Sequence, residues 1–154
     1  MSKKLAIVAA HGSLDAAYPP LILATAAVAM DMEAAIFFTF YGLEIIKKGN
    51  ADRLKVAPIA NPAMPMSIPS MVGVLPGMTA MATGMMHKWM HEAKVLSIGE
   101  LLETAKDLGV RLIGCQMTMD VLHIRAEDLI DGVEIGGAAT YLDYACDDAI
   151  ALSF

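Results

Sequence analysis

The sequence is short of cysteine, aromatic residues and charge. Of its 154 residues, only 18% are charged and 6% aromatic, and two are cysteines. Two cysteines are too few for a disulfide framework. The N-terminal apolar run is only six residues long and lacks the small-residue cleavage site that follows the core of a secretory signal. We therefore expect a protein of the reducing cytoplasm.

Clustered basic residues are also missing. The chain has 17 acidic and 11 basic residues, a formal net charge of -6 and no long basic run. Binding to a phosphate backbone requires clustered Lys and Arg side chains. We therefore do not expect nucleic acid as a partner.

Apolar residues are abundant instead. They make up 56% of the chain, with 13 methionines and 12 glycines, whereas soluble domains are nearer half apolar and a quarter charged. The length predicts a single domain, residues 1–154, that can bury a sizeable core. The excess apolar surface has to be covered, and we expect a homo-oligomer.

Short apolar runs alternate with helical segments along the chain. Residues 5–10, 34–40 and 110–114 are typical of strands buried on both faces. A shorter strand is expected at 133–135, and short helices at 43–48, 117–122 and 125–130. This alternation predicts an α/β fold with a mostly parallel sheet of four or five strands.

Three longer helices are expected between the strands. One covers residues 21–30, after Pro19 and Pro20, which fit only a first helical turn. A second begins at Ser97, where Glu100 completes a capping box, and ends before Gly109. The third covers residues 138–152.

Residues 51–92 form an insertion between the second and third strands. Its section 64–86 has no charged residue but contains three prolines and three glycines, which argue against a membrane span. The alternatives for this section are a flap, an interface between subunits and a peripheral membrane contact.

Cys115 is the residue best placed for chemistry. It follows a buried strand directly, and sites in open α/β sheets gather at the carboxyl ends of strands. A helix beginning after it would favour the nucleophilic thiolate. The alternative is a small buried apolar residue. His11 ends the first strand and is expected on the same edge of the sheet, where an imidazolium would lower the pKa of the thiol.

The other candidates are weaker. Cys146 lies in the last predicted helix, where a structural role is favoured; as a second thiol it would have to come within about 7 Å of Cys115, measured between Cα atoms. His87 and His91 share a helix face but lack the full HExxH pattern. No dinucleotide or phosphate-loop motif is present. We expect no metal and no organic cofactor.

Residues 109–130, which read GVRLIGCQMTMDVLHIRAEDLI, resemble the DsrE2-like branch of the DsrE/DsrF-like family. The hexad Cys-Gln-Met-Thr-Met-Asp at 115–120 is the most specific element. The opening run LAIVAAHGSLD, the Met-rich middle and the tail at 131–141 are similar to the same branch. The resemblance implies a three-layer Rossmann-like or flavodoxin-like domain that forms oligomers.

The resemblance also implies a role in sulfur trafficking. Family members accept sulfane sulfur as a cysteine persulfide and pass it on, and their sulfur-carrying cysteine corresponds to Cys115. Rhodanese-like and TusA-like proteins are the implied donors and acceptors, and some relatives are membrane-associated. Members often have glycine where this chain has His123. The residues expected to support Cys115 are His11, Ser13, Gln116 and Asp120.

Other functions remain open at this point. A sulfurtransferase or persulfide carrier is the interpretation that the resemblance favours. A thiol peroxidase or redox sensor would use Cys115 as a sulfenic acid, although the Thr and Pro usual before a peroxidatic cysteine are missing. A non-catalytic scaffold, oligomeric or membrane-associated, would act through the Met-rich segment, and a small-molecule or nucleotide binder is a further alternative.

Overall fold

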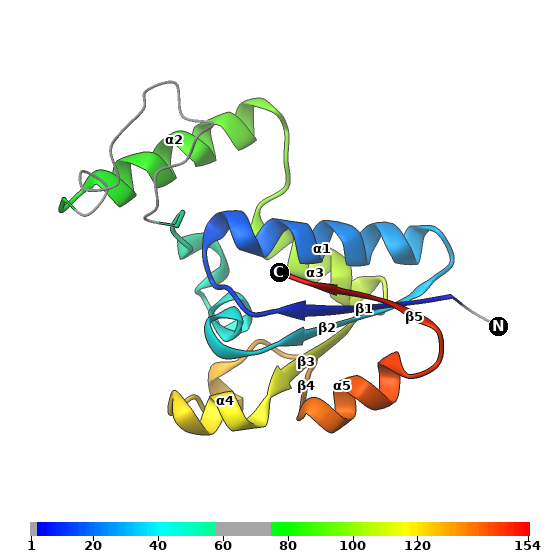
Figure 1. The fold of residues 1–154 in the computed structure, drawn as a ribbon. Helices are drawn as coiled ribbons and strands as arrows, with labels where there is room; N and C mark the ends of the chain where they lie inside the picture. The colour runs from blue at the N-terminus through cyan, green and yellow to red at the C-terminus, as the bar shows by residue number, and fades with distance from the viewer. Residues whose placement is uncertain (1–2, 58–74) are drawn as a thin grey trace.

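The computed structural model describes residues 3–57 and 75–154. In these ranges the chain forms one five-stranded sheet with the strand order β4-β3-β2-β1-β5 (Figure 1). The strands are β1 (Lys4–Ala9), β2 (Glu33–Phe38), β3 (Arg111–Cys115), β4 (Val133–Gly136) and β5 (Ala149–Ser153). All neighbouring pairs are parallel, so the predicted α/β fold is confirmed.

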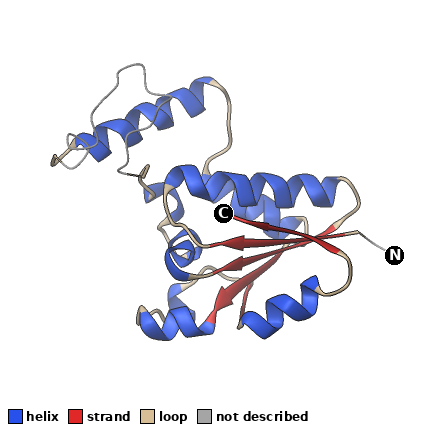
Figure 2. Cartoon of the chain, viewed as in Figure 1, coloured by secondary structure: helices blue, strands red, loops and turns tan. Residues whose placement is uncertain are grey.

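Helices cover both faces of the sheet (Figure 2). The α-helices are α1 (Leu14–Ala29), α2 (Met78–Glu92), α3 (Ile98–Asp107), α4 (Gln116–Val121) and α5 (Ala138–Ala145). The described ranges also contain the short 3-10 helices η1 (Phe40–Ile46), η2 (Ala51–Arg53) and η4 (Ala126–Asp128). α1 and α3 lie on one face, and α4 and α5 lie on the other, which gives three layers (Figure 1).

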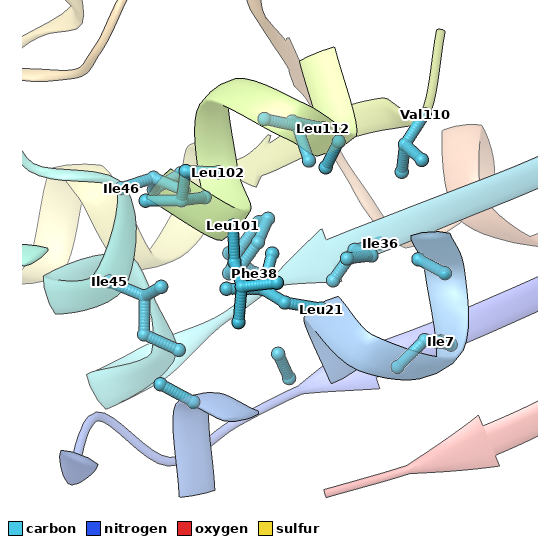
Figure 3. Packing of buried hydrophobic residues seen from close by; sticks show 14 of the residues in the cluster. Ile7, Leu21, Ile36, Phe38, Ile45, Ile46, Leu101, Leu102, Val110 and Leu112 are labelled. Atoms are coloured by element: carbon cyan, nitrogen blue, oxygen red, sulfur yellow. The ribbon is translucent and has the colours of Figure 1, made fainter. Parts of the chain in front are cut away.

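The larger core lies between the sheet and the layer formed by α1 and α3. Ile7, Ile36 and Leu112 point into it from three adjacent strands, and Leu21 and Leu102 meet them from the two helices (Figure 3). Alternate residues of each strand share a face. The sequence therefore folds with its most branched apolar residues toward α1 and α3.

The opposite face has a smaller core under α5. Ala6, Ala35, Phe37 and Ile113 are buried there. The Phe37 and Tyr141 rings lie 5.6 Å apart between centroids. Because the same strand faces carry Cys115 at their carboxyl end, this smaller core supports the cysteine directly.

The capping box that the sequence predicted for α3 is confirmed. Ser97 Oγ accepts a hydrogen bond from the Glu100 amide at 3.2 Å, and the Glu100 carboxylate accepts one from the Ser97 amide at 2.8 Å. Gly109 follows the helix with φ +84°, the left-handed conformation that ends helices. Both ends of α3 are thus determined by local sequence.

The expectation that Pro19 and Pro20 occupy a first helical turn is wrong. α1 begins at Leu14, and both prolines lie inside it. Neither proline has an amide proton to donate to the helix. Leu14, Ala17 and other apolar residues of α1 are buried against the sheet, and this packing offsets the loss.

The expected final helix at 138–152 is also wrong beyond Ala145. Asp148 adopts φ +54°, and the chain then enters β5, which pairs with the free edge of β1. Ile150 lies beside Leu5 and Leu152 beside Ile7. The pairing partner lies at the other end of the sequence, so local pattern alone favoured the helix.

The predicted insertion contains α2 and lies between β2 and β3 in the chain. α2 extends away from the sheet (Figure 1), and no residue of α2 is fully buried. Of the Met-rich section 64–86, residues 64–74 lie outside the described ranges. Among the helices of residues 3–57 and 75–154, none is long and apolar enough to cross a membrane.

Candidate functional site

Cys115 is the last residue of β3 and the N-cap of α4. Its side chain is only 4% exposed and packs with Phe37 and Ile113 in the smaller core. The thiol therefore lies at the carboxyl edge of the sheet, as predicted, but beneath the surface. Its backbone is extended, with φ -72° and ψ 113°, and the chain turns into α4 immediately after it.

Two threonine hydroxyls meet beside Cys115. Thr118 lies one turn further along α4 and is 1% exposed. Thr39 comes from the end of β2, the strand next to β3. Their Oγ1 atoms are 3.1 Å apart, and Thr118 Oγ1 also accepts a hydrogen bond from the Phe40 amide at 3.1 Å. Thr118 is buried with its hydroxyl satisfied.

Hydrogen-bond donors beside Cys115 act on the pKa of its thiol. Burial by itself raises the pKa of the Cys115 thiol. Hydrogen bonds from the hydroxyl and amide of Thr118, the hydroxyl of Thr39 and the amide of Met117 outweigh burial, and the pKa lies below its ordinary value. Donors to the charged form favour the thiolate, so the site stabilises the nucleophilic state of the sulfur.

The two segments that carry the threonines also carry exposed apolar side chains, which we call the apolar rim: Phe40, Tyr41, Met117, Val121 and Leu122. Phe40 is half exposed and has φ +46°. A bulky residue in the left-handed region is strained, and the Phe40 amide donates its hydrogen bond to Thr118.

His11 and Ser13 lie on the same edge of the sheet but are not the neighbours of Cys115. Both follow β1, and β2 lies between β1 and β3. Two strand spacings amount to about 10 Å. Thr39 occupies the intervening position. Ser13 is the N-cap of α1 without a side-chain capping bond, and His11 is exposed.

Gln116 and Asp120 bind each other. The Gln116 amide donates a hydrogen bond to the Asp120 carboxylate at 2.9 Å, and both residues are exposed. Thr118 and Met119, on the opposite side of α4, are buried. The hydrogen bond between Gln116 and Asp120 thus lies on the exposed face of α4, and Thr118 lies on the buried face, on the side of Cys115.

Cys146 lies far from Cys115. It is exposed after the end of α5, and its thiol donates to the Asp143 carbonyl at 3.1 Å. The next residue, Asp147, forms an ion pair with Lys4 at the amino end of β1. Cys115 is at the carboxyl end of β3. The two cysteines of one chain are therefore not within disulfide distance.

His87 and His91 are both on α2. Within residues 3–57 and 75–154, no group of three or more His, Cys, Asp or Glu side chains is arranged to hold a metal ion. His123 is exposed with φ +54°. This left-handed conformation gives a physical reason for the glycine that the resembling sequences often have there.

Thr39 and Thr118 were not singled out by the sequence reasoning. The sequence nevertheless contains a feature that indicates each of them. Thr118 is three residues after Cys115 in the hexad, a spacing that places it on the same side of a helical turn. Thr39 is the first polar residue after the apolar strand β2. The contact between them depends on the β2–β3 pairing, which local sequence does not specify.

Comparisons with known proteins agree with this architecture. The family model of the DsrE/DsrF/DrsH-like family matches residues 1–153. Sulfur carrier protein DsrE2 of Allochromatium vinosum is 46% identical over 156 residues, covering 97% of each chain. Uncharacterized protein YrkE of Bacillus subtilis is 30% identical over 154 residues, covering 98% of this chain and 96% of that protein.

A solved structure has the same fold. The crystal structure of the ychN protein from E. coli matches with a TM-score of 0.60 and 18% identity, over 100% of both chains. At that identity the likeness concerns the fold alone. The match of the family model and the identity to DsrE2 both extend over nearly the whole chain. The chain belongs to the DsrE/DsrF/DrsH-like family.

Proposed function

We propose that this protein carries sulfane sulfur as a persulfide on Cys115. The observation that carries the proposal is a buried thiol surrounded by hydrogen-bond donors that favour its thiolate. A relative 46% identical over nearly the whole chain is named a sulfur carrier protein. That kinship supports a role in sulfur trafficking, and the surroundings of Cys115 support the assignment of the sulfur to this residue.

Loading is a displacement at sulfur. The Cys115 thiolate attacks the outer sulfur of a donor persulfide, a new S–S bond forms, and the donor thiolate leaves with the electron pair of the broken S–S bond. Delivery repeats this displacement with an acceptor thiolate. One sulfur atom moves in each step, no net oxidation occurs, and no metal or organic cofactor enters the balance.

The surroundings of Cys115 suit a carried persulfide. Burial keeps water and oxidants away from a reactive group, and the donors of Thr118 and Met117 meet the charge on the sulfur. Cys115 is only 4% exposed and is not open to a partner thiol. Loading therefore requires a local displacement of neighbouring groups, and we propose that the apolar rim, where Phe40 and Met117 are exposed, moves.

Intact mass measurement tests the proposal. The reduced protein is exposed to a sulfane-sulfur donor alongside Cys115→Ser and Cys146→Ser. We expect the wild type and Cys146→Ser to gain one sulfur and Cys115→Ser to gain none. No gain on the wild type would overturn the carrier function. A mass gain of one oxygen with peroxide, and consumption of that peroxide at a useful rate, would favour a thiol redox protein instead.

Protein donors and acceptors of the rhodanese-like and TusA-like kind are the partners that this function implies. We propose that they approach over the apolar rim, because it lies on the two segments that carry Thr39 and Thr118. Large apolar side chains are also exposed elsewhere, including Ile22, Met30, Leu142 and Ile150. We propose that subunit contacts cover part of this surface in a homo-oligomer, which light scattering coupled to size-exclusion chromatography would measure.

For the Met-rich section 64–86 we still propose a contact with membranes or with sister subunits. Its described part lies at the start of α2, where Leu75 and Met81 are more than half exposed. Deleting residues 64–86 tests the scaffold alternative. If the deletion variant still loads sulfur on Cys115 and delivers it, the carrier function is independent of this section. If it loads sulfur on Cys115 but no longer delivers it, the scaffold is favoured.

A further inference from the structure

The hydroxyls of Thr39 and Thr118 are hydrogen-bonded to each other, and together they have two protons to donate. Each hydroxyl has one proton to donate and two lone pairs to accept. Thr118 Oγ1 accepts from the Phe40 amide at 3.1 Å, and the two Oγ1 atoms are joined by a hydrogen bond of 3.1 Å. That bond uses one of the two hydroxyl protons, whichever residue donates it.

The second proton remains available to the sulfur. If Thr39 donates to Thr118, the Thr118 proton is free; if Thr118 donates to Thr39, the Thr39 proton is free. Both threonines lie beside Cys115: Thr39 follows Phe38, which pairs with Gly114, and Thr118 is in the first turn of α4, which Cys115 caps. Hydrogen bonding from both hydroxyls lowers the pKa of the Cys115 thiol. One hydroxyl proton of the pair can therefore meet the sulfur in either arrangement, and the strained Phe40 backbone fixes the pair by occupying a lone pair of Thr118.

The charge on Cys115 Sγ changes during the reaction of the proposed function, on which this inference rests. In the loaded state Sγ is bonded to the outer sulfur and carries no full charge. During delivery an acceptor thiolate RS⁻ attacks the outer sulfur, so that RS⁻ and Cys115–S–SH become RS–SH and Cys115–S⁻. The electron pair of the broken S–S bond returns to Sγ. A donor aimed at Sγ thus binds the product of delivery more strongly than the loaded state.

We propose that Thr39 and Thr118 are catalytic residues of the delivery step, stabilising Cys115 as the leaving thiolate. A better leaving thiol is displaced faster, so the pair biases the protein toward giving sulfur away rather than storing it. Phe40 is a positioning residue, because its amide acts on the sulfur only through Thr118.

Valine substitutions test the proton count, with Cys146→Ser as the background so that only Cys115 reacts. Thr39→Val and Thr118→Val each leave one hydroxyl whose proton can still reach the sulfur. The double variant Thr39→Val/Thr118→Val leaves none. We expect single variants to deliver sulfur to glutathione within about threefold of the background rate, and the double variant to be about tenfold slower. Thr39→Ser/Thr118→Val and Thr39→Val/Thr118→Ser each retain one hydroxyl and should deliver sulfur at a rate close to that of the background protein.

Two readouts separate this inference from the carrier function itself. Intact mass reports whether Cys115 loads at all, and the pH profile of iodoacetamide alkylation reports the thiolate without any sulfur donor. The double variant should move that profile to higher pH. Failure of the background protein to load sulfur overturns the proposed function; normal loading, with an unchanged profile and delivery rate in the double variant, overturns only the role of the threonines.

Controls address folding. Thr25→Val removes a hydroxyl that donates to the Leu21 and Ile22 carbonyls within α1 itself, and should change neither readout. If Thr118→Val unfolds the chain because the Phe40 amide loses its acceptor, Thr118→Ala replaces it in the double variant, since the smaller side chain leaves room for a water. Slowing that is equal in Thr25→Val and the double variant would overturn the assignment.

Discussion

Lys4 Nζ lies 3.3 Å from Asp147 Oδ2 and ties the turn before β5 to the amino end of β1. Cys146 is therefore held at the amino ends of the strands, whereas Cys115 ends β3. Lys4 pairs with Glu33 and Gly114 with Phe38, at opposite ends of β2. Five residue steps along a strand span about 16 Å. This separation excludes a resolving role for Cys146 within one chain of this fold.

We accordingly predict that mild oxidation forms no Cys115–Cys146 disulfide within a chain. Non-reducing peptide mapping after diamide treatment measures it, and exposed Cys146 should appear in disulfides between chains. Cys146→Ser should abolish those and leave sulfur loading unchanged. An intrachain Cys115–Cys146 peptide in high yield would contradict the arrangement of α5 and β5 described above.

A second prediction concerns the pH dependence of Cys115 alkylation. Hydrogen bonds from Thr118, Thr39 and Met117 outweigh the effect of burial and lower the pKa of the thiol. The reaction with iodoacetamide should therefore rise at lower pH than that of an ordinary thiol, measured in the Cys146→Ser variant. Because the side chain is 4% exposed, the plateau rate should lie below that of a free thiolate, and denaturant should raise it.

A profile with its midpoint at or above that of free cysteine would contradict the donor set around the sulfur. A low midpoint with a fast plateau would contradict only the burial of Cys115. Because midpoint and plateau report different properties, a single titration tests the hydrogen bonds and the accessibility separately.

Local sequence was sufficient for several elements. The apolar runs gave β1, β2 and β3, and the Ser97–Glu100 capping box gave the start of α3, because these patterns act within a few residues. The position of Cys115 at a strand end followed from the same runs. These features depend on neighbours in the chain.

Other features depend on contacts between distant segments. β5 exists because Ile150 and Leu152 pair with the open edge of β1, and α1 keeps two internal prolines because its apolar face is buried. The pairing of the two threonines beside Cys115 is equally long-range: Thr118 is a near neighbour of Cys115 in the chain, but Thr39 is 79 residues from Thr118. No helix or strand period reports such a pairing, so the sequence pointed to His11 and Ser13, which lie beyond β2.

Gly42 offers a test of how closely the loops at the site are packed. A Cβ atom at Gly42 would lie 1.9 Å from the Ala9 carbonyl oxygen, and the Gly42 amide donates to the Thr39 carbonyl at 2.9 Å. Gly42→Ala should lower the free energy of unfolding by about 2–4 kcal/mol and slow sulfur delivery by displacing Thr39 and the Phe40 amide. Guanidinium unfolding and the rate of sulfur delivery to glutathione measure the two effects.

Gly84→Ala is the matched control for that substitution. Gly84 lies inside α2, and a Cβ atom added there would meet nothing within 4 Å. Alanine is the better helix former by about 1 kcal/mol, so the control should be neutral or stabilising. Equal destabilisation by both substitutions would contradict the close approach of Gly42 to β1.

His123→Gly should stabilise the protein without changing its chemistry. His123 is exposed and has φ +54°, where a residue with a Cβ atom is disfavoured. Relief of the left-handed strain, less the greater entropy of glycine in the unfolded chain, should raise the free energy of unfolding by about 0.5–1 kcal/mol and leave sulfur loading unchanged. Asp148→Gly, also at φ +54° but remote from Cys115, is the control. A loss of loading confined to His123→Gly would instead reveal a chemical role for the imidazole.

The lowered pKa of Cys115 also predicts how stability varies with pH. When the folded state has the lower thiol pKa, the unfolded state binds more protons between the two pKa values, so the free energy of unfolding rises with pH in that window. Below the folded pKa both states are protonated, and this contribution disappears. Above the unfolded pKa, near that of free cysteine, it is complete. Cys115→Ser cannot ionise in this range and lacks the contribution.

The measurement is guanidinium unfolding of wild type and Cys115→Ser, both in the Cys146→Ser background, at several pH values up to about 9, just above the ordinary pKa of a thiol. We expect the stability difference between them to shift in favour of Cys115 as pH rises. Every other titrating group is common to both proteins and cancels in the difference. The contrary result is a difference in the free energy of unfolding that does not change with pH, or that shifts in favour of Cys115→Ser as pH rises. Burial would then outweigh the hydrogen bonds from Thr118, Thr39 and Met117, and the folded protein would not favour the thiolate.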